Sequence, residues 1–390
     1  MSGGDLPLGA QGSQPDPTGG WSEEIVTLKR AVVVPPLKGD FIQPAGVLSE
    51  DGAYCAHGAL WRKFRALTIA PEMPERAEPL PGRWLWGGVL WAHFGHFLVE
   101  SSARLWALDQ LEQPVDGILF MPRRPRAGDA VRGFHKDFIH LMAPEMPIRV
   151  VTDPASVEEL VVPGQGFGLG RITAGTESFR QAVHNRFAAD VAAEGPEKIY
   201  ISRSALGVGK GGLVGEERME ELLASEGYEI FHPQRHDMAT QIARYKAAKQ
   251  IVAADGSAIH LFAMVGRADQ SLAIVLRRKS LANNLLQSNV THFCGREPLM
   301  IEALRSEWVK ATDKKRSNRL SFGELDLQKI GAMLAEGGFI RDAGAWEALS
   351  DEERQALFAA KKLTGKNALE ELPKYKRNRI RAARRARKAT

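Results

Sequence analysis

The strongest constraint on the fold is a regular alternation of apolar runs with amphipathic segments in the second half of the chain. Four runs have the length of a strand: KIYISR (198–203), YEIFHP (228–233), QIVAAD (250–255) and SLAIVLRR (271–278). The segments between them have helical periodicity. Such alternation is typical of a parallel sheet covered by helices. We therefore predict a Rossmann-like α/β domain with four strands over residues 195–300.

The N-terminal half shows a weaker version of the same pattern. Predicted strands are GILFMP (117–122), IRVV (148–151) and VEELVVPG (157–164), and the second half of the apolar stretch 84–109 is predicted to be helical. GQGFGLGRITAG (164–175) contains five glycines and is predicted to be a flexible loop, followed by a helix over 176–193. We expect residues 21–194 to form a first α/β domain. The expected fold class is thus α/β, with two Rossmann-like domains facing a ligand cleft.

The ends of the chain differ from its body. Residues 1–20 are rich in Gly, Pro, Ser and Gln and are expected to form a flexible tail without the features of a signal peptide. Residues 301–373 are expected to be a helical extension, in which Ser350 and Glu353 form a capping box. No stretch approaches the ~20 apolar residues of a membrane span. Two cysteines are too few for a disulfide framework, so we expect a cytoplasmic protein.

Residues 374–390 form a basic tail. They hold nine Lys or Arg residues and no acidic residue, which is more than the whole net charge of +5. One interpretation is peripheral contact with an anionic membrane at its inner face. A second is non-specific attraction to nucleic acid, and a third is a solvated tail without a partner. We expect no specific nucleic-acid partner.

WAHFGHFLVESSARLW (91–106) places polar residues among aromatic and aliphatic ones. If a helix begins near His96, then His96, Glu100 and Arg104 share one face. Charges on an apolar helix need partners or a ligand. The three side chains could form an internal network, with Glu100 accepting from the other two, or a catalytic or binding face. A third possibility is a metal site formed by His93, His96 and Glu100.

Two later stretches have features of anion sites. KIYISRSALGVGKGG (198–212) is a strand followed by Ser202, Arg203 and a glycine-rich loop, which could hold phosphates or be a plain surface loop. IVAADGSAIH (251–260) is a strand ending in Asp255, Gly256 and Ser257 before a helix. This turn could bind an anion at the helix N-terminus, or its side chains could simply cap the helix.

These three stretches, in this order, resemble glycosyltransferase family 61 over about residues 85–280. GHFLVESSARLW resembles the family's His-Phe-Leu-Leu-acid helix followed by Arg-Leu, and YISRS resembles its Tyr-Ile-Ser-Arg strand end. TQIARYKAAKQIVAADGSAIHLF is similar to the segment in which Ile-Val precedes His-Gly-Ala-Gly. The chain departs from the family pattern at four places: Asp255 replaces His, Ser257-Ala258 replace Ala-Gly, Gly215 replaces Asn, and Leu276-Arg277 replace a later acidic position.

The resemblance implies a GT-B type, inverting glycosyltransferase of surface or capsular polysaccharide biosynthesis. Its substrates would be a nucleotide-sugar donor and an oligosaccharide or polysaccharide acceptor, with no cofactor and no metal. Either Glu100 or His96 would be the base and the other would orient it. His93 and Arg104 would support the acceptor pocket, or Arg104 would fix Glu100. The residues expected at the donor are Ser202, Arg203, Lys210, Glu216, Asp255, Gly256 and Ser257.

Two other functions remain compatible with these residues. The altered Asp255 motif could belong to a degenerate, non-catalytic protein that binds glycan or acts as a scaffold. A metal-dependent hydrolase could use His93, His96 and Glu100. No residue pattern specifies the donor sugar, the linkage or the oligomeric state.

Overall fold

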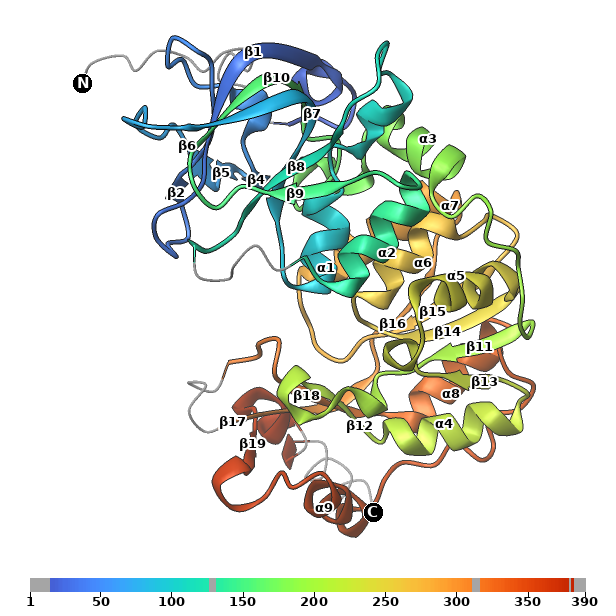
Figure 1. The fold of residues 1–390 in the computed structure, drawn as a ribbon. Helices are drawn as coiled ribbons and strands as arrows, with labels where there is room; N and C mark the ends of the chain where they lie inside the picture. Colours follow the sequence, from blue (N-terminus) through green and yellow to red (C-terminus); the bar gives the residue numbers. More distant parts are fainter. Residues whose placement is uncertain (1–14, 126–130, 311–315, 379, 382–390) are drawn as a thin grey trace. The chain divides into compact units, whose positions relative to one another are not determined.

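The computed structural model describes residues 15–125, 131–310, 316–378 and 380–381 (Figure 1). The chain folds as two compact units. Unit 1 comprises residues 1–192, 260–266 and 288–294, and unit 2 comprises residues 193–259, 267–287 and 295–390. Most of the predicted N-terminal tail, residues 1–14, lies outside the described residues, as do residues 379 and 382–390 of the basic tail. Residues 373–378, where the basic tail begins, are helical.

Unit 1 is built on a six-stranded sheet in the order β3-β1-β10-β7-β8-β9. The strands are β1 (Ile25–Val34), β3 (Gly46–Leu48), β7 (Glu78–Leu90), β8 (Gly117–Pro122), β9 (Ile148–Val150) and β10 (Ala155–Pro163). The predicted strands in the three apolar runs are confirmed as β8, β9 and β10. Strands β10, β7, β8 and β9 run parallel, whereas β1 runs antiparallel to both β10 and β3. The sheet is therefore mixed, unlike the parallel sheet expected of a Rossmann-like domain.

Short elements complete unit 1. Its helices include α1 (Phe94–His96), the π-helical turn η3 (Phe97–Ser101), α2 (Gly133–Met142) and α3 (Glu177–Arg186). Two small strand pairs lie beside the main sheet: β2 (Gln43–Pro44) with β6 (Thr68–Ile69), and β4 (Trp61–Arg62) with β5 (Arg65–Ala66). The 3-10 turns that lie wholly within the described residues include, in both units, η1 (Gly20–Glu23), η2 (Ala56–Gly58), η4 (Leu105–Asp109), η6 (Arg171–Ala174), η7 (Ser204–Leu206), η8 (Val208–Lys210), η9 (Pro233–Arg235) and η11 (Gly365–Asn367).

The glycine-rich segment 164–175 is not the flexible loop that was expected. Residues 164–168 are buried within unit 1, and the Trp106 indole donates to the Gly164 carbonyl over 3.1 Å. A Cβ on Gly164 would lie 1.8 Å from the Trp21 carbonyl oxygen, and one on Gly166 would lie 2.9 Å from the Trp106 ring. These glycines allow close packing of backbone against its neighbours, and this need, rather than flexibility, explains the composition.

Unit 2 contains the predicted parallel sheet. Its strands are β11 (Lys198–Ile201), β13 (Glu229–Phe231), β14 (Gln250–Ala254), β15 (Ser271–Val275) and β16 (Leu299–Ile301), in the order β13-β11-β14-β15-β16. All pairs are parallel, and the order is 2-1-3-4-5 along the chain, a doubly wound arrangement. The four predicted strands are confirmed. Strand β16 was not predicted, because it has only three residues and lies between charged segments, and so short an apolar run does not distinguish a strand from other structures.

Helices cover both faces of this sheet. Helix α5 (Met238–Ala247) lies on one side, and α4 (Glu216–Ser225) and α8 (Leu327–Glu336) lie on the other (Figure 1). Side chains of α4 and α8 share a core with Tyr200, Val252 and Val275 of the sheet. Helices α6 (Ala258–Val265) and α7 (Ala282–Cys294) follow β14 and β15.

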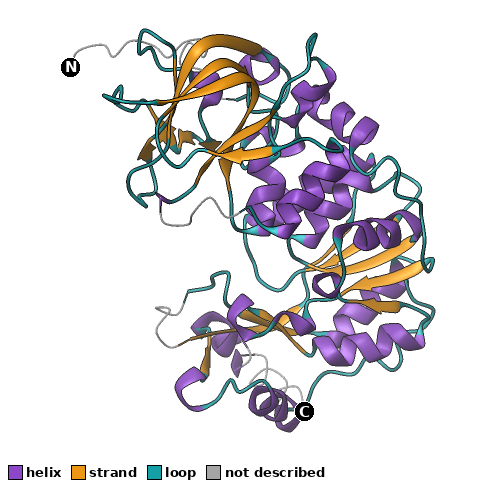
Figure 2. Ribbon diagram, viewed as in Figure 1, coloured by secondary structure: helices purple, strands orange, loops and turns teal. Residues whose placement is uncertain are grey.

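Residues 301–373 are not purely helical, as Figure 2 shows. Strands β17 (Leu304–Lys310), β18 (Phe322–Leu325) and β19 (Leu369–Glu371) join β12 (Gly212–Val214) in a four-stranded sheet ordered β12-β18-β17-β19. Helices α8 and α9 (Asp351–Ala360) also lie in this segment, and Ser350 and Glu353 form the predicted capping box. The expectation of a helical extension was therefore incomplete, because β12 and β18 pair across more than one hundred residues of chain.

No helix among the described residues is long and apolar enough to cross a membrane.

Candidate active site

The 91–106 motif of unit 1 follows strand β7, and helix α1 starts at its fourth residue, Phe94. Helix α1 passes directly into the π-helical turn, in which the Ser102 N–H donates to the Phe97 carbonyl over 3.2 Å. A π-turn inserts one residue into the helical repeat and is frequent at functional sites. Ser101 anchors the turn, since its hydroxyl donates to the Val89 carbonyl over 2.7 Å and accepts from the Trp91 N–H over 3.0 Å.

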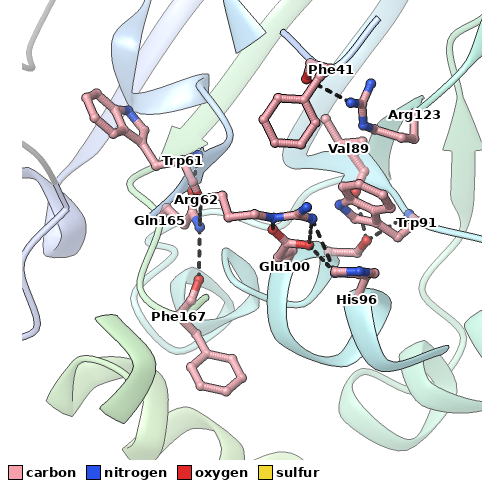
Figure 3. A network of polar contacts seen from close by, with 11 residues as sticks. Phe41, Trp61, Arg62, Val89, Trp91, His96, Glu100, Arg123, Gln165 and Phe167 are labelled. Atoms are coloured by element: carbon pink, nitrogen blue, oxygen red, sulfur yellow. Dashed lines mark hydrogen bonds and ion pairs between the residues drawn. The ribbon is translucent and has the colours of Figure 1, made fainter. Parts of the chain in front are cut away.

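Glu100 lies at the centre of a buried polar cluster (Figure 3). The Arg62 guanidinium binds its carboxylate at two points: Nε donates to Oε1 over 2.8 Å and Nη2 donates to Oε2 over 2.6 Å. His96 Nδ1 lies 2.7 Å from the same Oε2. Arg62 comes from strand β4 and was not identified from the sequence. No local pattern marks it, because it lies 38 residues from Glu100 in the chain.

The charge of Glu100 determines the tautomer of His96. Burial by itself raises the pKa of Glu100, but hydrogen bonds from His96 and Arg62 outweigh it and leave the pKa below its ordinary value. An ionised carboxylate only accepts hydrogen bonds, so Nδ1 of His96 must carry the proton. Whenever the ring holds a single proton, its Nε2 atom is therefore an acceptor, on a side chain that is 33% exposed.

Arg104 does not contact Glu100. Its Nη2 donates to the carbonyls of His57 and Ala59 over 2.9 and 2.6 Å, and the side chain is fully buried. Burial lowers the pKa of Arg104 to about 10. The expectation that His96, Glu100 and Arg104 share a helix face was wrong, because the π-turn and the following turn end the helical repeat before residue 104. Arg104 instead holds the backbone of residues 57–59, which precede β4 and Arg62 in the chain.

Trp91 lies beside this cluster. Its ring stacks on His96 with centroids 4.7 Å apart, and the guanidinium carbons of Arg62 and Arg123 lie 4.8 and 5.2 Å from its centroid. Burial, followed by the charges of Arg62 and Arg124, lowers the pKa of Arg123. The surroundings of His96 are therefore aromatic and carry an excess of positive charge.

His93 is exposed and lies edge-on to His96, with ring centroids 5.2 Å apart. Among the described residues, no three or more His, Cys, Asp or Glu side chains are grouped so as to hold a metal ion. At Glu100 the physical reason is clear, because the Arg62 guanidinium occupies both carboxylate oxygens.

In unit 2, Glu216 organises the turn that follows strand β11. Glu216 Oε1 accepts from the Arg203 N–H over 2.7 Å and from the Tyr200 hydroxyl over 3.0 Å. Burial raises the pKa of Glu216 to about 7. The Ser202 hydroxyl donates to Glu220 and is buried. Glu216 and Ser202 thus form hydrogen bonds with neighbouring residues of unit 2.

Asp255 and Arg277, two departures from the family pattern, contact each other. Arg277 Nε donates to Asp255 Oδ1 over 2.7 Å, and both side chains are at most 10% exposed. These residues follow the neighbouring strands β14 and β15, whose carboxyl ends meet at one edge of the parallel sheet. The two changes therefore form one buried ion pair.

Arg203 lies at the same edge, after β11, against the turn at Gly256. A Cβ on Gly256 would lie 2.6 Å from Arg203 Nη1, so the glycine makes room for the guanidinium. Arg203 Nε and Arg278 Nε are buried and have no hydrogen-bond partner within the described part of the chain. The Lys210 side chain is exposed, and its carbonyl accepts from Arg203 Nη2 over 3.4 Å. Ser257 is partly exposed beside Gly256. This edge of the sheet therefore contains guanidinium N–H donors that no group in the described part of the chain accepts from.

Part of the chain is similar to a known protein family. Residues 94–268 match the family model described as Glycosyltransferase 61. The matched segment includes His96, Glu100, Arg203 and Asp255 but not Arg62 or Arg277. A comparison with curated protein sequences finds no match.

Proposed function

Since residues 94–268 carry the sequence pattern of glycosyltransferase family 61, which supports a transferase, we propose that this protein is an inverting glycosyltransferase. It moves a sugar from a nucleotide-sugar donor to a glycan acceptor. The observation that carries the proposal is the Arg62–Glu100–His96 cluster within a motif of that family.

In this proposal His96 is the base and Glu100 orients it. The acceptor hydroxyl oxygen attacks the anomeric carbon while the bond from that carbon to the diphosphate oxygen breaks. The hydroxyl proton passes to Nε2 of His96, and the Glu100 carboxylate stabilises the imidazolium that forms. Glu100 is less suited to be the base, because its oxygens are occupied by Arg62 and His96 and its pKa is lowered. A single displacement inverts the anomeric configuration.

The donor diphosphate is placed at the carboxyl ends of the parallel strands of unit 2. Arg203, Lys210 and the Gly256-Ser257 turn would face it, and the unpartnered Nε atoms of Arg203 and Arg278 support an anion there. Ser202, Glu216 and Asp255 would then hold these groups in place rather than touch the donor. Cationic side chains would neutralise the leaving group, and the proposal requires neither a cofactor nor a metal ion.

The proposal extends to the setting of the reaction. We include the GT-B organisation, a role in surface or capsular polysaccharide biosynthesis, and a cytoplasmic location with peripheral contact between residues 374–390 and an anionic membrane. The cytoplasmic location is supported by Cys55 and Cys294, which are free and buried.

One observation favours a second candidate, a non-catalytic protein of the same family that binds glycan. The Asp255 carboxylate is committed to Arg277 in a buried pair, so it is not available to a ligand. A metal-dependent hydrolase gains no comparable support, since no suitable group of ligands occurs among the described residues.

The test begins with a panel of nucleotide sugars measured by thermal shift, because a ligand at 100 times its Kd stabilises the folded state by about 2.7 kcal/mol. Turnover with the donor that binds is then measured for His96→Ala and Glu100→Gln. We expect His96→Ala to lower kcat by about 10²- to 10⁴-fold. His140→Ala, which changes an exposed histidine on α2, is the matched control and should keep full activity.

Full activity of a folded His96→Ala variant would contradict the role of His96. Donor binding without turnover by the wild type, combined with glycan binding, would favour the non-catalytic candidate. If no nucleotide sugar raises the melting temperature, the transferase proposal fails.

A further inference from the structure

Exposed apolar side chains gather in one segment of unit 1. The described residues include nine large apolar side chains that are exposed, and six of them lie between residues 37 and 73. We call these six the apolar patch: Leu37, Phe41, Ile42, Phe64, Ile69 and Met73. The most exposed are Leu37 at 85% and Phe64 at 75%. Single exposed apolar residues are common on protein surfaces, whereas a cluster of them is typical of an interaction site.

Backbone and side-chain contacts hold this segment together. Strand β2 pairs with β6, so that Pro44 lies opposite Ile69, and the Gln43 side chain donates to the Lys38 carbonyl over 2.5 Å. The guanidinium carbon of Arg65 lies 5.6 Å from the centroid of Phe41. Figure 1 accordingly shows β2, β4, β5 and β6 close together on one side of unit 1.

The tip of the β4–β5 hairpin is held rigidly. Lys63, at the turn, has a positive φ of 56°, and its N–H donates to the Leu169 carbonyl over 2.5 Å. Gly170 packs against the Lys63 backbone so closely that a Cβ there would lie 2.7 Å from the α-carbon of Lys63. Phe64 is therefore presented to solvent by a fixed turn.

Cations outnumber anions around the apolar patch: Lys38, Lys63, Arg65, Arg123 and Arg124 against Asp40, Glu72 and Glu75. The hairpin Trp61–Ala66 carries Arg62, Lys63 and Arg65 and no acidic residue. Arg123 reaches the patch through Nη2, which donates to the carbonyls of Asp40 and Phe41 over 3.0 and 2.9 Å. Within the described residues, Lys63, Arg65 and Arg124 have no ion-pair partner. Protruding aromatic and aliphatic side chains among free cations are the combination that binds an anionic lipid surface.

We propose that the apolar patch and its cations dock unit 1 on an anionic phospholipid membrane. The apolar side chains enter the headgroup region, and Lys63, Arg65 and Arg124 meet lipid phosphates. Arg123 links the apolar patch to the His96 cluster, because it donates to the Phe41 carbonyl and lies over the Trp91 ring (Figure 3). Trp91 in turn stacks on His96. Docking would therefore place the His96 cluster near the membrane surface. This inference is distinct from membrane contact by residues 374–390 and does not depend on transferase activity.

Vesicle co-sedimentation of the full chain tests the proposal. The vesicles contain phosphatidylcholine alone or with phosphatidylglycerol. We expect binding to the anionic vesicles that weakens with added salt. The double variant Leu37→Ser/Phe64→Ser should lower the partition coefficient about ten-fold, because two exposed apolar side chains are lost. Leu281→Ser is the matched control, since Leu281 is 79% exposed but lies in unit 2, and it should bind like the wild type.

Two further variants make the result decisive. Lys63→Gln/Arg124→Gln should reduce binding to anionic vesicles and leave binding to neutral vesicles unchanged. A chain ending at residue 373, which lacks the whole basic tail, should retain most of the binding. Equal binding by the Leu37→Ser/Phe64→Ser variant and the wild type would overturn the proposal, as would complete loss of binding in the shortened chain. Lipid-independent self-association that the double variant abolishes would also overturn it, because the patch would then join two copies of the chain.

Discussion

Glu100 is a buried carboxylate whose charge depends on partners from other parts of the chain. Its side chain is fully buried, and the Arg62 side chain is only 16% exposed. Transfer of a charge out of water costs several kcal/mol, and this cost is offset only when the ion is well paired. The two-point contact with Arg62 and the hydrogen bond with His96 together provide that pairing.

We predict that Arg62→Met lowers the free energy of unfolding by about 3–5 kcal/mol, because it leaves the buried Glu100 charge poorly compensated. Urea unfolding at neutral pH measures this change. Arg65→Met, on the exposed side of the same hairpin, should change stability by less than about 0.5 kcal/mol. The double variant Arg62→Met/Glu100→Gln should recover much of the loss, and a double variant as unstable as Arg62→Met would contradict the explanation.

Glu216 predicts a specific pH dependence of stability. Burial raises its pKa from 4.5 to about 7 in the folded protein, so the folded state holds this proton more tightly than the unfolded state does. The resulting stabilisation is fully present below about pH 4.5 and is lost as the pH rises through about 7. Over this range the contribution is on the order of 3 kcal/mol.

We expect Glu216→Gln to remove this dependence while keeping the hydrogen bond from the Arg203 N–H. The variant should be more stable than the wild type at pH 8 and close to it at pH 5, as measured by chemical unfolding across that range. Glu221→Gln, at an exposed position of the same helix, should leave the pH profile unchanged. If stability depended on pH in Glu216→Gln as it does in the wild type, another titratable group would be responsible for the pH dependence.

At the scale of elements, the turn after β14 is shaped to fit the turn after β11. Arg203 lies where the side chain of any residue other than glycine at position 256 would be. Because the guanidinium is the flexible end of a side chain, Gly256→Ala would displace it at little cost in stability. A displaced Arg203 could no longer meet the diphosphate at the carboxyl ends of the strands.

We therefore predict that Gly256→Ala raises the Kd for the nucleotide-sugar donor about ten-fold or more, while the melting temperature stays within a few degrees. Calorimetric titration and thermal unfolding measure the two effects. Gly209→Ala is the control, because nothing lies within 4 Å of a Cβ at that position, and it should bind normally. Unaltered donor affinity in Gly256→Ala would remove Arg203 from the donor contacts.

At the scale of the whole molecule, unit 2 has a hydrophobic core that joins one face of the parallel sheet to the C-terminal strands and helices. Tyr200 and Val252 of the parallel sheet belong to the same cluster as Trp308, Ile330 and Phe358. Strand β12, which follows the glycine-rich loop after β11, also pairs with β18, so its backbone hydrogen bonds depend on residues 322–324. The C-terminal segment is thus part of the unit and not an appendage.

We predict that a chain ending at residue 301 loses the cooperative unfolding of unit 2, because its core side chains would be exposed to water. A chain ending at residue 381 should melt like the full-length protein. Circular dichroism and differential scanning calorimetry compare the two. Cooperative melting of the chain that ends at residue 301, at the temperature of the full protein, would contradict a shared core.

Local pattern was sufficient for elements whose residues are close in the chain. An apolar run in the sequence marks each of the strands β11, β13, β14 and β15, and a capping box at Ser350 marks the start of helix α9. The local sequence pattern was insufficient where a strand pairs with another strand that is distant in the chain. Strand β12 is three residues of a glycine-rich loop, and only β18 makes it a strand.

Short-range spacing and recognisable motifs were enough to predict the parallel α/β unit, the match of residues 94–268 to the Glycosyltransferase 61 model and the pairing of His96 with Glu100. The cation that meets Glu100 could be identified only from the folded chain. The π-turn rotates Arg104 away from that face, and a hairpin 38 residues earlier brings Arg62 to it. The physical reason is that a buried carboxylate must find a cationic partner, and the chain can supply one from any segment that folding brings within reach.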